Sequence, residues 1–435
     1  MEVVRASEHE ALQRAAAGGL FEAGVVSGDR IALLARPTAG VLAVALGALR
    51  RGIVPVMLDP ALPPVERAAL LADCRPALTV DGPDDVRALL TGAPSLLSPA
   101  PLGRPMHYTS GTSGRRKGVW SGVLEPEDAA ALLAEEVELW SFTPADRHLV
   151  LSPLYHSAPL RFAAATLLAG GTVLLPGKFD PAAALAVIDE HQPTTTFCVP
   201  TQLRRLLATG TPKGASFRLL AHAGEPCPAP LKERVLEAFG DEVVAEFYGS
   251  TEGQFTVCPA SEWRSHAGTV GRARPHRQLS VDAADGSVWC AVPRYARFSY
   301  WDAPEKSAAA WHGDAFSVGD IGRLDAEGYL YLEGRRDDLV ITGGVNVYPR
   351  EVERVLDECP GVDEIAVFGV EDDHWGQRLC AAVVGTATPA DLHTYAAAEL
   401  PPARRPKEYH PVAEMPRTGT GKIRRLDLPS ALGLR

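Results

Sequence analysis

Short, continuously apolar segments alternate with helix-like segments over residues 30–247 of the chain. Residues 30–35 and 54–58 read as buried strands, and residues 39–51 between them have the apolar density of a helix packed on a sheet. A strand that is apolar at consecutive positions is buried on both faces, which is typical of a parallel sheet covered by helices. The pattern therefore predicts an α/β fold of layered sheets with helices.

The rest of the chain divides into regions that differ in their hydrophobic pattern and turn signals. The same strand pattern recurs at residues 77–80, 148–152, 171–175, 194–199, 217–221 and 243–247. Over residues 280–335, short strands separated by turn signals indicate a small antiparallel sheet or distorted barrel. Beyond residue 337 the expected elements are a helix, two strands and a helix, at 349–359, 364–370, 379–384 and 389–399. We therefore expect a large N-terminal domain, residues 1–336, and a small mobile α+β domain, residues 337–435.

The charge and the cysteine content exclude several classes of protein. The 435 residues carry 43 Lys and Arg against 54 Asp and Glu, a formal net charge of −11 that repels nucleic acid and anionic membranes. The seven cysteines form no Cys-x-x-Cys pair and no Cys/His spacing suited to zinc, so we expect free thiols. The N-terminus lacks the apolar core of a signal peptide, and the longest apolar run, 39–49, is shorter than the roughly 20 residues of a membrane span. We therefore expect a cytoplasmic protein that has neither a nucleic-acid nor a membrane partner.

A segment rich in glycine and hydroxyl groups is the first candidate for chemistry. Residues 108–119 read Tyr-Thr-Ser-Gly-Thr-Ser-Gly-Arg-Arg-Lys-Gly-Val. The N–H and O–H groups of such a loop, with a lysine beside them, can wrap a phosphate, whereas a solvated Ser/Gly loop is the plain alternative. A Walker A loop is excluded, because no Gly-x-x-x-x-Gly-Lys-Ser/Thr sequence occurs.

Three further segments carry candidate chemistry. Residues 246–253, Glu-Phe-Tyr-Gly-Ser-Thr-Glu-Gly, follow an apolar strand and offer a hydroxyl and a carboxylate that can hold Mg²⁺ beside a nucleotide phosphate. Residues 316–353 contain Val-Gly-Asp-Ile-Gly-Arg, Gly-Arg-Arg-Asp-Asp and Gly-Gly-Val-Asn-Val-Tyr-Pro-Arg. Residues 416–425 read Pro-Arg-Thr-Gly-Thr-Gly-Lys-Ile-Arg-Arg.

In this order and spacing, the four segments resemble those of the adenylate-forming superfamily: acyl-CoA synthetases, adenylation domains of nonribosomal peptide synthetases, and firefly luciferase. The resemblance covers nearly the whole chain and includes segments at 153–160, 223–226 and 286–301. It implies that a carboxylate attacks the α-phosphorus of ATP, giving an acyl-adenylate and pyrophosphate, and that a thiol then takes the acyl group. The first step brings two anions together, so positioning and charge neutralisation dominate it. ATP, Mg²⁺, coenzyme A and a small-molecule acid are the ligands that the resemblance implies.

The resemblance also implies roles for particular residues. The loop over the β,γ-phosphates is expected to comprise Thr109, Ser110, Gly111, Thr112, Ser113, Gly114 and Lys117. Residues expected around the adenine and the ribose are Gly224, Glu225, Pro226, Tyr248, Gly249, Asp320 and Arg335. Thr251 is expected to touch phosphate and Glu252 to hold Mg²⁺. A carboxylate acceptor and a forked guanidinium donor suit the two ribose hydroxyls, which is the role implied for Asp320 and Arg335.

Four more positions take roles from the resemblance. Lys422 is the expected adenylation catalyst, since its ammonium can sit between the attacking carboxylate and the α-phosphate. Asp337 is the expected hinge between that arrangement and a second one, in which the loop around Gly343 and Gly344 lines the thiol tunnel. His156 is expected to gate the acyl pocket. The plain alternatives are a surface lysine, a charged turn and a core histidine. Residues expected either in the pocket walls or in the core are Tyr155, Phe197, Val199 and Phe255.

The chain departs from the family pattern in a few places. Arg116 stands where the family usually has Pro, and Ser113 where Thr is common; both changes keep the chemistry of the loop. Val318 replaces the usual Thr before Gly-Asp and removes a hydroxyl near the expected ribose. The phosphate loop begins early in the chain, and a trimmed N-terminal region of this kind would suit a biosynthetic enzyme with a small substrate.

Three hypotheses for the function remain. The first is a carboxylate–CoA ligase that acts on a small aromatic or short acyl acid. The second keeps adenylation but changes the acceptor to a carrier-protein thiol or an amine, or the acid to an unusual one such as nitrite. The third is a non-catalytic nucleotide-binding relic, against which the joint presence of Lys422, Glu252 and Asp320 argues. The acid, the acceptor and the oligomeric state stay open.

Overall fold

The computed structural model describes residues 1–109, 116–212, 216–417 and 423–434. Its largest sheet has eight strands in the order β1-β8-β7-β9-β10-β11-β12-β13. These are β1 Glu2–Arg5, β7 Arg147–Val150, β8 Thr172–Leu175, β9 Thr195–Cys198, β10 Leu219–His222, β11 Val244–Glu246, β12 Thr256–Pro259 and β13 Arg272–Ala273. The strands from β8 to β11 in this order pair in parallel, as predicted, whereas β1, β12 and β13 pair antiparallel at the edges.

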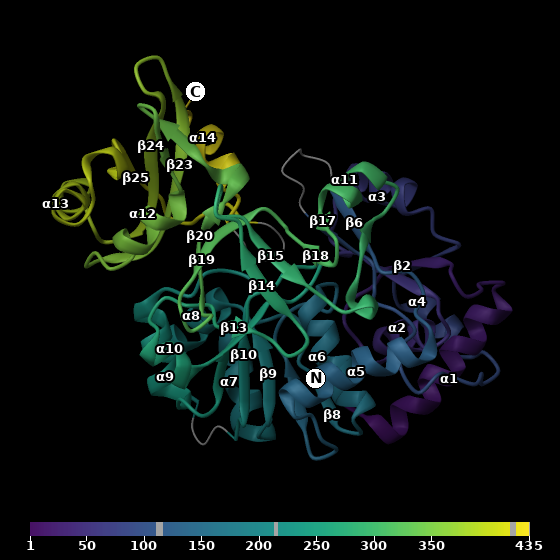
Figure 1. Ribbon diagram of the computed structural model, residues 1–435. Helices are drawn as coiled ribbons and strands as arrows, with labels where there is room; N and C mark the ends of the chain where they lie inside the picture. The colour runs from purple at the N-terminus through teal and green to yellow at the C-terminus, as the bar shows by residue number, and fades with distance from the viewer. Residues whose placement is uncertain (110–115, 213–215, 418–422, 435) are drawn as a thin grey trace.

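Helices cover both faces of this main sheet (Figure 1). They are α5 Pro126–Trp140 and α6 Ser157–Leu168 on one face, and α7 Pro181–His191, α8 Pro200–Thr209, α9 Ala229–Phe239 and α10 Ala260–Ser265 on the other. Neighbouring residues of one strand enter opposite layers: in β10, Leu219 packs in the cluster of Phe162 from α6, and Leu220 in the cluster of Val235 from α9. Because side chains alternate along a strand, burial on both faces requires the continuous apolar runs seen in the sequence.

A second parallel sheet, in the order β3-β2-β4, lies nearer the N-terminus. Its elements are β2 Arg30–Leu34, β3 Val54–Met57, β4 Leu78–Asp81, α1 Ala6–Glu22, α2 Ala39–Leu49, α3 Pro64–Cys74 and α4 Pro83–Leu89. Helix α2 is buried over Val41–Leu49, since one hydrophobic cluster joins it to Ile31 of β2 and to Val173 of the main sheet. The contact between α1 and α2 requires Gly47, where an added Cβ would lie 2.5 Å from the carbonyl oxygen of Gln13.

Antiparallel pieces connect these layers to the rest of the chain. The sheet β16-β6-β5 consists of β5 His107–Thr109, β6 Lys117–Trp120 and β16 Ser299–Tyr300. Beyond it come β14 Gln278–Val281, β15 Val288–Ala291, α11 Pro304–Ala309, β17 Trp311–His312, β18 Ala315–Phe316, β19 Asp320–Leu324 and β20 Leu330–Arg335. They form the antiparallel sheets β14-β15-β18-β17 and β19-β20, which bears out the small antiparallel sheet expected over residues 280–335.

The C-terminal part folds around a mixed sheet in the order β22-β21-β24-β23, with β25 beside β24. Its elements are β21 Val340–Thr342, β22 Val345–Val347, α12 Pro349–Leu356, β23 Val362–Asp372, β24 Gly376–Gly385, α13 Pro389–Glu399, β25 Glu408–Pro411 and α14 Leu428–Ala431. Val352 and Leu356 of α12 are buried, as the amphipathic pattern predicts. The hydrophobic clusters of this part contain only residues from Val340 onward, and Figure 1 shows it set above α8, α9 and α10. The boundary at residues 336 and 337 stays a prediction.

Two exclusions made from composition can be compared with the structure. All seven cysteines are free thiols, as expected. Among the described residues, no helix is both long and apolar enough to span a bilayer.

Candidate active site

The segments that follow the parallel strands of the main sheet meet at one edge. His222, the last residue of β10, is paired in register with Glu246, the last residue of β11. The segment 223–226 therefore lies beside the segment 247–253, and both carry residues that the sequence singled out. Ligands of open α/β sheets bind at this carboxyl edge. Gly224 has a φ of 96°, a left-handed conformation that favours glycine at this turn.

A buried polar triad holds the two strand ends together. Lys232 of α9 is 0% exposed, and its Nζ lies 2.6 Å from Nε2 of His222 and 3.1 Å from Oε2 of Glu246. Burial and the ammonium of Lys232 lower the pKa of His222 well below its ordinary value, so this ring is neutral. The sequence analysis missed the triad, because nothing in the apolar helix pattern marks Lys232 as an inward-facing residue.

The expected metal residue and the expected phosphate lysine meet at a tyrosine. The hydroxyl of Tyr300 donates to Oε1 of Glu252 at 3.0 Å, and Glu252 is only 6% exposed. The Nζ of Lys117 lies 5.1 Å from the centroid of the Tyr300 ring, within the range of a cation–π contact. Burial and the Glu252 carboxylate raise the pKa of Tyr300, which stays a hydrogen-bond donor. Thr109 is paired with Lys117 in the register of β5 and β6, so it belongs to the same group of residues.

The expected ribose residues pair with each other. Asp320 and Arg335 face one another across β19 and β20, and Arg335 Nε donates to Asp320 Oδ1 at 2.9 Å. The hydroxyl of Tyr248 donates to the other carboxylate oxygen, so the expected adenine residue joins this pair. Burial and Asp320 raise the pKa of Tyr248 well above its ordinary value. The Tyr248 ring lies 4.6 Å from the ring of Phe255, centroid to centroid.

Other predicted residues take less central places. Glu225 accepts from the backbone N–H of Thr201 at 2.6 Å, which joins its segment to the first turn of α8. Gly249 has little room, because an added Cβ would lie 3.0 Å from the carbonyl oxygen of Gly253. Gly343 and Gly344, in the turn between β21 and β22, both adopt left-handed backbone conformations. Asp337 lies in a 3₁₀ turn, Arg336–Asp338, and its role as a hinge stays a prediction.

Six predicted residues lie outside the described part of the chain: Ser110, Gly111, Thr112, Ser113, Gly114 and Lys422. The nearest described residues on either side of Lys422 are Arg417 and Ile423. Arg417 forms an isolated antiparallel bridge with Ile423, and its Nη1 lies 3.5 Å from Oγ1 of Thr201. The residues that flank Lys422 in the described chain are therefore attached beside the segment that holds Glu225.

His156 lies at the N-terminal end of α6 and is half-buried, near the buried His107. Its ring centroid is 4.5 Å from that of Tyr155. Nδ1 of His107 lies 3.0 Å from the carbonyl oxygen of Tyr155, and burial together with His156 lowers the pKa of His107 to about 3. His107 is therefore neutral, and its Nδ1 carries the proton that the carbonyl accepts. A gating role for His156 stays a prediction.

A cavity of about 140 Å³ adjoins this edge of the sheet. Its walls come largely from α5, from α6 and from residues 101–107, and Thr251 and Gln254 also line it. The four residues that the sequence analysis placed in pocket walls or in the core are absent from the described lining. Of these, Phe197 and Phe255 pack in the core clusters, so the core alternative is right for them. The arginines of the lining were not anticipated.

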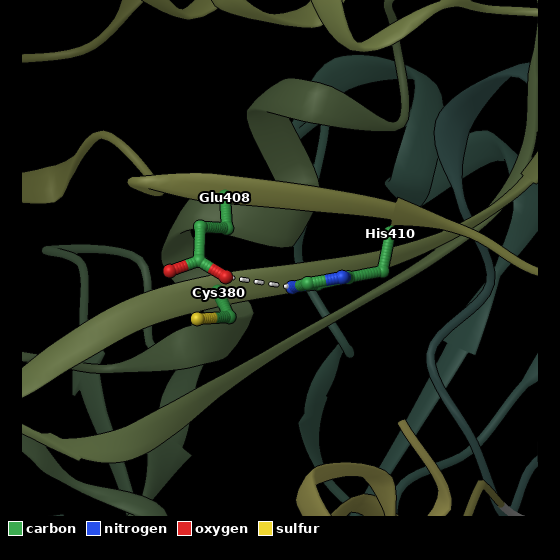
Figure 2. A group of neighbouring side chains, drawn as sticks. All are labelled: Cys380, Glu408 and His410. Atoms are coloured by element: carbon green, nitrogen blue, oxygen red, sulfur yellow. Dashed lines mark ion pairs between the residues drawn. The ribbon is translucent and has the colours of Figure 1, made fainter. Parts of the chain in front are cut away.

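One cluster of potential metal ligands lies away from this edge, in the C-terminal sheet. Figure 2 shows Cys380 of β24 beside Glu408 and His410 of β25, and their ligand atoms lie within 4.8 Å of one another. Sequence spacing did not reveal the cluster, because pairing of distant strands creates it. Arg378 Nε donates to Glu408 at 2.9 Å, and burial raises the pKa of the Cys380 thiol to about 11. Glu408 thus already has a cationic partner and the thiol is protonated, so we assign no metal here.

Comparison with known families gives two adjacent matches. Residues 7–99 and 105–290 match the AMP-binding enzyme family, and residues 351–422 match the AMP-binding enzyme C-terminal domain. Feruloyl-CoA synthase of an Amycolatopsis species is 31% identical over 447 residues, covering 94% of this chain and 89% of the relative. Indoleacetate–CoA ligase of Aromatoleum aromaticum is 32% identical over 344 residues, covering 74% of this chain and 66% of the relative.

Solved structures agree over nearly the whole chain. ATP-bound MatB of Rhodopseudomonas palustris superposes with a TM-score of 0.86 at 29% identity, covering 98% of this chain and 93% of that one. The apo structure of MatB gives 0.74 at the same identity and coverage, so the arrangement of this chain is nearer to the ATP-bound one. The amide bond synthetase McbA of Marinactinospora thermotolerans gives 0.85 at 26% identity, covering 98% of this chain and 94% of that one.

Proposed function

Since the chain belongs to the AMP-binding enzyme family of the adenylate-forming superfamily and is an AMP-forming acid–thiol ligase, we propose that it joins a small aromatic or short acyl acid to coenzyme A. The proposal rests on two groups of residues that meet at the carboxyl edge of the main sheet. One is the Glu252–Tyr300 pair with Lys117 over the ring, and the other is Asp320, which Tyr248 and Arg335 both contact. Residues 247–252 connect the two groups directly.

The first group suits a triphosphate. Lys117 supplies a positive charge at the base of the β5–β6 hairpin, and Thr109 lies opposite it in the register. Glu252 fits a magnesium site, because its carboxylate is buried, and two residues before it in the chain Ser250 has a buried Oγ without a hydrogen-bond partner in the described chain. When bound, Mg²⁺ would neutralise phosphate charge during the attack of the acid. Thr251 lines the cavity next to this group, so we assign the same loop to the nucleotide and the acid.

The second group suits a nucleoside. Asp320 is 6% exposed and keeps one oxygen bound to Arg335 and the other to Tyr248. A carboxylate held in this way is a fixed acceptor for ribose hydroxyls, and the guanidinium of Arg335 is a donor beside it. We assign the adenine to the segment 223–226, which Glu225 joins to α8.

Catalysis of the first step is assigned to Lys422, which carries its charge between the acid and the α-phosphate. Arg417 holds the chain ahead of it against Thr201, beside the proposed adenine segment. We further propose that the C-terminal domain turns about Asp337 before thioester formation, so that the loop of Gly343 and Gly344 replaces Lys422 at the acid. The higher TM-score with ATP-bound MatB than with apo MatB supports the view that the present arrangement is the adenylating one.

A second candidate function keeps the adenylation step and changes the acceptor. The likeness to the amide bond synthetase McbA favours an amine as that acceptor, with a TM-score of 0.85. Both functions share every residue assigned to the first step, so only the second half-reaction distinguishes them.

ATP–pyrophosphate exchange tests the proposal, followed by AMP release over a panel of acids with and without coenzyme A. We expect exchange with at least one acid and AMP release that requires coenzyme A. AMP release that ignores coenzyme A but responds to amines would favour the second candidate. Absence of exchange with every acid would refute both functions and would favour the hypothesis of a non-catalytic nucleotide-binding relic.

A further inference from the structure

The cavity beside Thr251 has an unusual wall for an acid-activating enzyme. Consecutive carboxylates from α5, Glu135 and Glu136, line it although the buried face of an amphipathic helix is normally apolar. Arginines from three separate segments line it as well: Arg104, Arg161, Arg274 and Arg277. Among the described residues of the wall, four arginines thus face two glutamates, an excess of two positive charges.

Two of these arginines are neutralised inside the wall. Arg277 binds Glu135 through both ends of its fork, with Nη1 at 2.7 Å and Nη2 at 3.2 Å. Arg161 Nε donates to Glu136 at 2.8 Å, and Glu136 also accepts from the indole of Trp140. Burial alone would raise the pKa of Glu136, but the neighbouring arginines hold it below its ordinary value, so Glu136 is an ionised partner rather than a neutral acid.

The other two arginines are less completely neutralised. Arg274 Nη2 pairs with Oε2 of Glu136 at 3.5 Å, and Arg161 binds the other oxygen, so two arginines share one negative charge. Arg104 donates to the backbone carbonyls of Glu252 and Arg297, at 3.0 and 3.1 Å, and forms no ion pair with a carboxylate in the described chain. Burial, with Arg277 and Arg161 nearby, lowers the pKa of Arg104 to about 10, yet it remains a cation at neutral pH. Arg104 is half-buried and its Nε is fully buried, so part of this charge has lost water without gaining a partner, which is costly.

Unmet hydrogen-bond donors mark all four arginines of the wall. The Nε atoms of Arg104, Arg274 and Arg277 and the Nη2 atom of Arg161 are buried and have no partner in the described chain. Arg274 is 3% exposed, so bulk water does not replace the missing partner. A purely structural network would satisfy its donors and balance its charges. This wall does neither, and a bound anion would do both.

The position of the wall relates this anion to the reaction. Arg104 is bonded to the backbone of Glu252, the residue proposed to hold Mg²⁺, and Thr251 borders the cavity. An acid in the cavity would therefore lie against the arginines of the wall and beside the loop that we assign to the phosphates. The cavity of about 140 Å³ is smaller than the roughly 300–1,000 Å³ of drug-sized ligand sites, which favours a short molecule.

We propose that the substrate is a short acid with a second anionic group, a carboxylate or a sulfonate, and that Arg104 and Arg274 bind this second group. The proposal rests on the proposed function, since it assigns the first carboxylate to adenylation. The forked donors of a guanidinium match either oxyanion. Monocarboxylates of the same length leave the excess positive charge of these arginines uncompensated and bind weakly.

Matched pairs of acids test the proposal. Butanoate and butanedioate, and propanoate and sulfopropanoate, differ only in the second anionic group. We expect kcat/KM for AMP release to be about 100-fold higher for the dianion of each pair, the size of effect expected when a charged hydrogen-bonding partner is missing. Equal kcat/KM values within both pairs, or a preference for the monoacid, would overturn the proposal.

Variants assign the effect to the arginines. Arg104→Met should raise KM about 30- to 100-fold more for the dianions than for the monoacids, since the lost hydrogen bond to the Glu252 backbone affects both kinds of acid. Arg104→Lys should recover part of this difference. Arg294→Met is the matched control, because Arg294 is exposed outside this cavity. An equal loss for dianions and monoacids in folded Arg104→Met would refute the assignment.

Ligand-induced stabilisation separates this proposal from the proposed function. Butanedioate should raise the Tm of the wild type and not that of Arg104→Met, whether or not AMP is released. A Tm shift without AMP release supports the anion site and refutes only the ligase assignment. Absence of any Tm shift, together with equal activity toward monoacids and dianions, refutes the anion site.

Discussion

Arg204 of α8 and Glu364 of β23 form an ion pair between the large and the small part of the molecule, with Nη1 and Oε1 2.8 Å apart. Arg417 donates to the other oxygen of Glu364, so one carboxylate holds two arginines. Neither Glu364 nor Arg204 is fully exposed. Since α8 also carries Thr201, the partner of Glu225, this carboxylate attaches the C-terminal part next to the proposed adenine segment.

Replacing this carboxylate should affect one half-reaction only. Glu364→Gln keeps the shape but removes the charge, so we expect adenylation by the folded protein to fall about 5- to 20-fold, corresponding to about 1–2 kcal/mol for a partly buried pair. Thioester formation from a supplied acyl-adenylate should change little, because the proposed second arrangement separates these residues. Pyrophosphate exchange and thioester formation measure the two steps. Asp372→Asn, which alters an ion pair inside the C-terminal part, is the control.

Lys422→Ala should have a larger effect in the same direction. Removing a point charge from the site where negative charge develops costs about 100- to 1,000-fold in the adenylation rate. Thioester formation from supplied acyl-adenylate should stay within a few fold of the wild type. Lys407→Ala, which removes an exposed lysine over Trp375, is the control. Similar losses in both half-reactions would argue against two arrangements of the C-terminal domain.

The Lys232 triad should contribute strongly to stability. Lys232→Met leaves the carboxylate of Glu246 buried without its cation, so we expect the free energy of unfolding to fall by about 3–5 kcal/mol. The double variant Lys232→Met/Glu246→Gln removes the unpaired charge and should recover part of that loss. Denaturant unfolding of both variants measures the difference. A double variant less stable than Lys232→Met would show that Glu246 has other partners.

The sequence predicted the layered sheets for a physical reason, because burial on both faces forces continuous apolar strands. It named Gly224 and Glu252 from the family resemblance, and the parallel strands before them place both segments at one edge of the sheet. The partners that orient these residues could not be predicted. Tyr300 reaches Glu252 through pairing of β16 with β6, and Arg274 reaches Glu136 through packing of distant elements. Such contacts leave no periodic signal in the sequence. A buried arginine cannot be distinguished from an exposed one until the tertiary structure is known.

Asp357, at the end of α12, should make stability depend on pH. Burial and the neighbouring carboxylates of Glu353 and Glu364 raise its pKa from 3.8 to about 7, although Arg204 opposes this. The folded protein therefore binds a proton more tightly than the unfolded chain, and stability falls as the pH rises from about 4 to about 7. Asp357→Asn removes the dependence, so we expect its Tm to exceed that of the wild type at pH 8 and the gain to shrink toward pH 4. Thermal unfolding across this range measures it, with the exposed Asp363→Asn as the control. A gain in Tm that is the same at pH 4.5 and pH 8 would rule out titration of Asp357 as its cause.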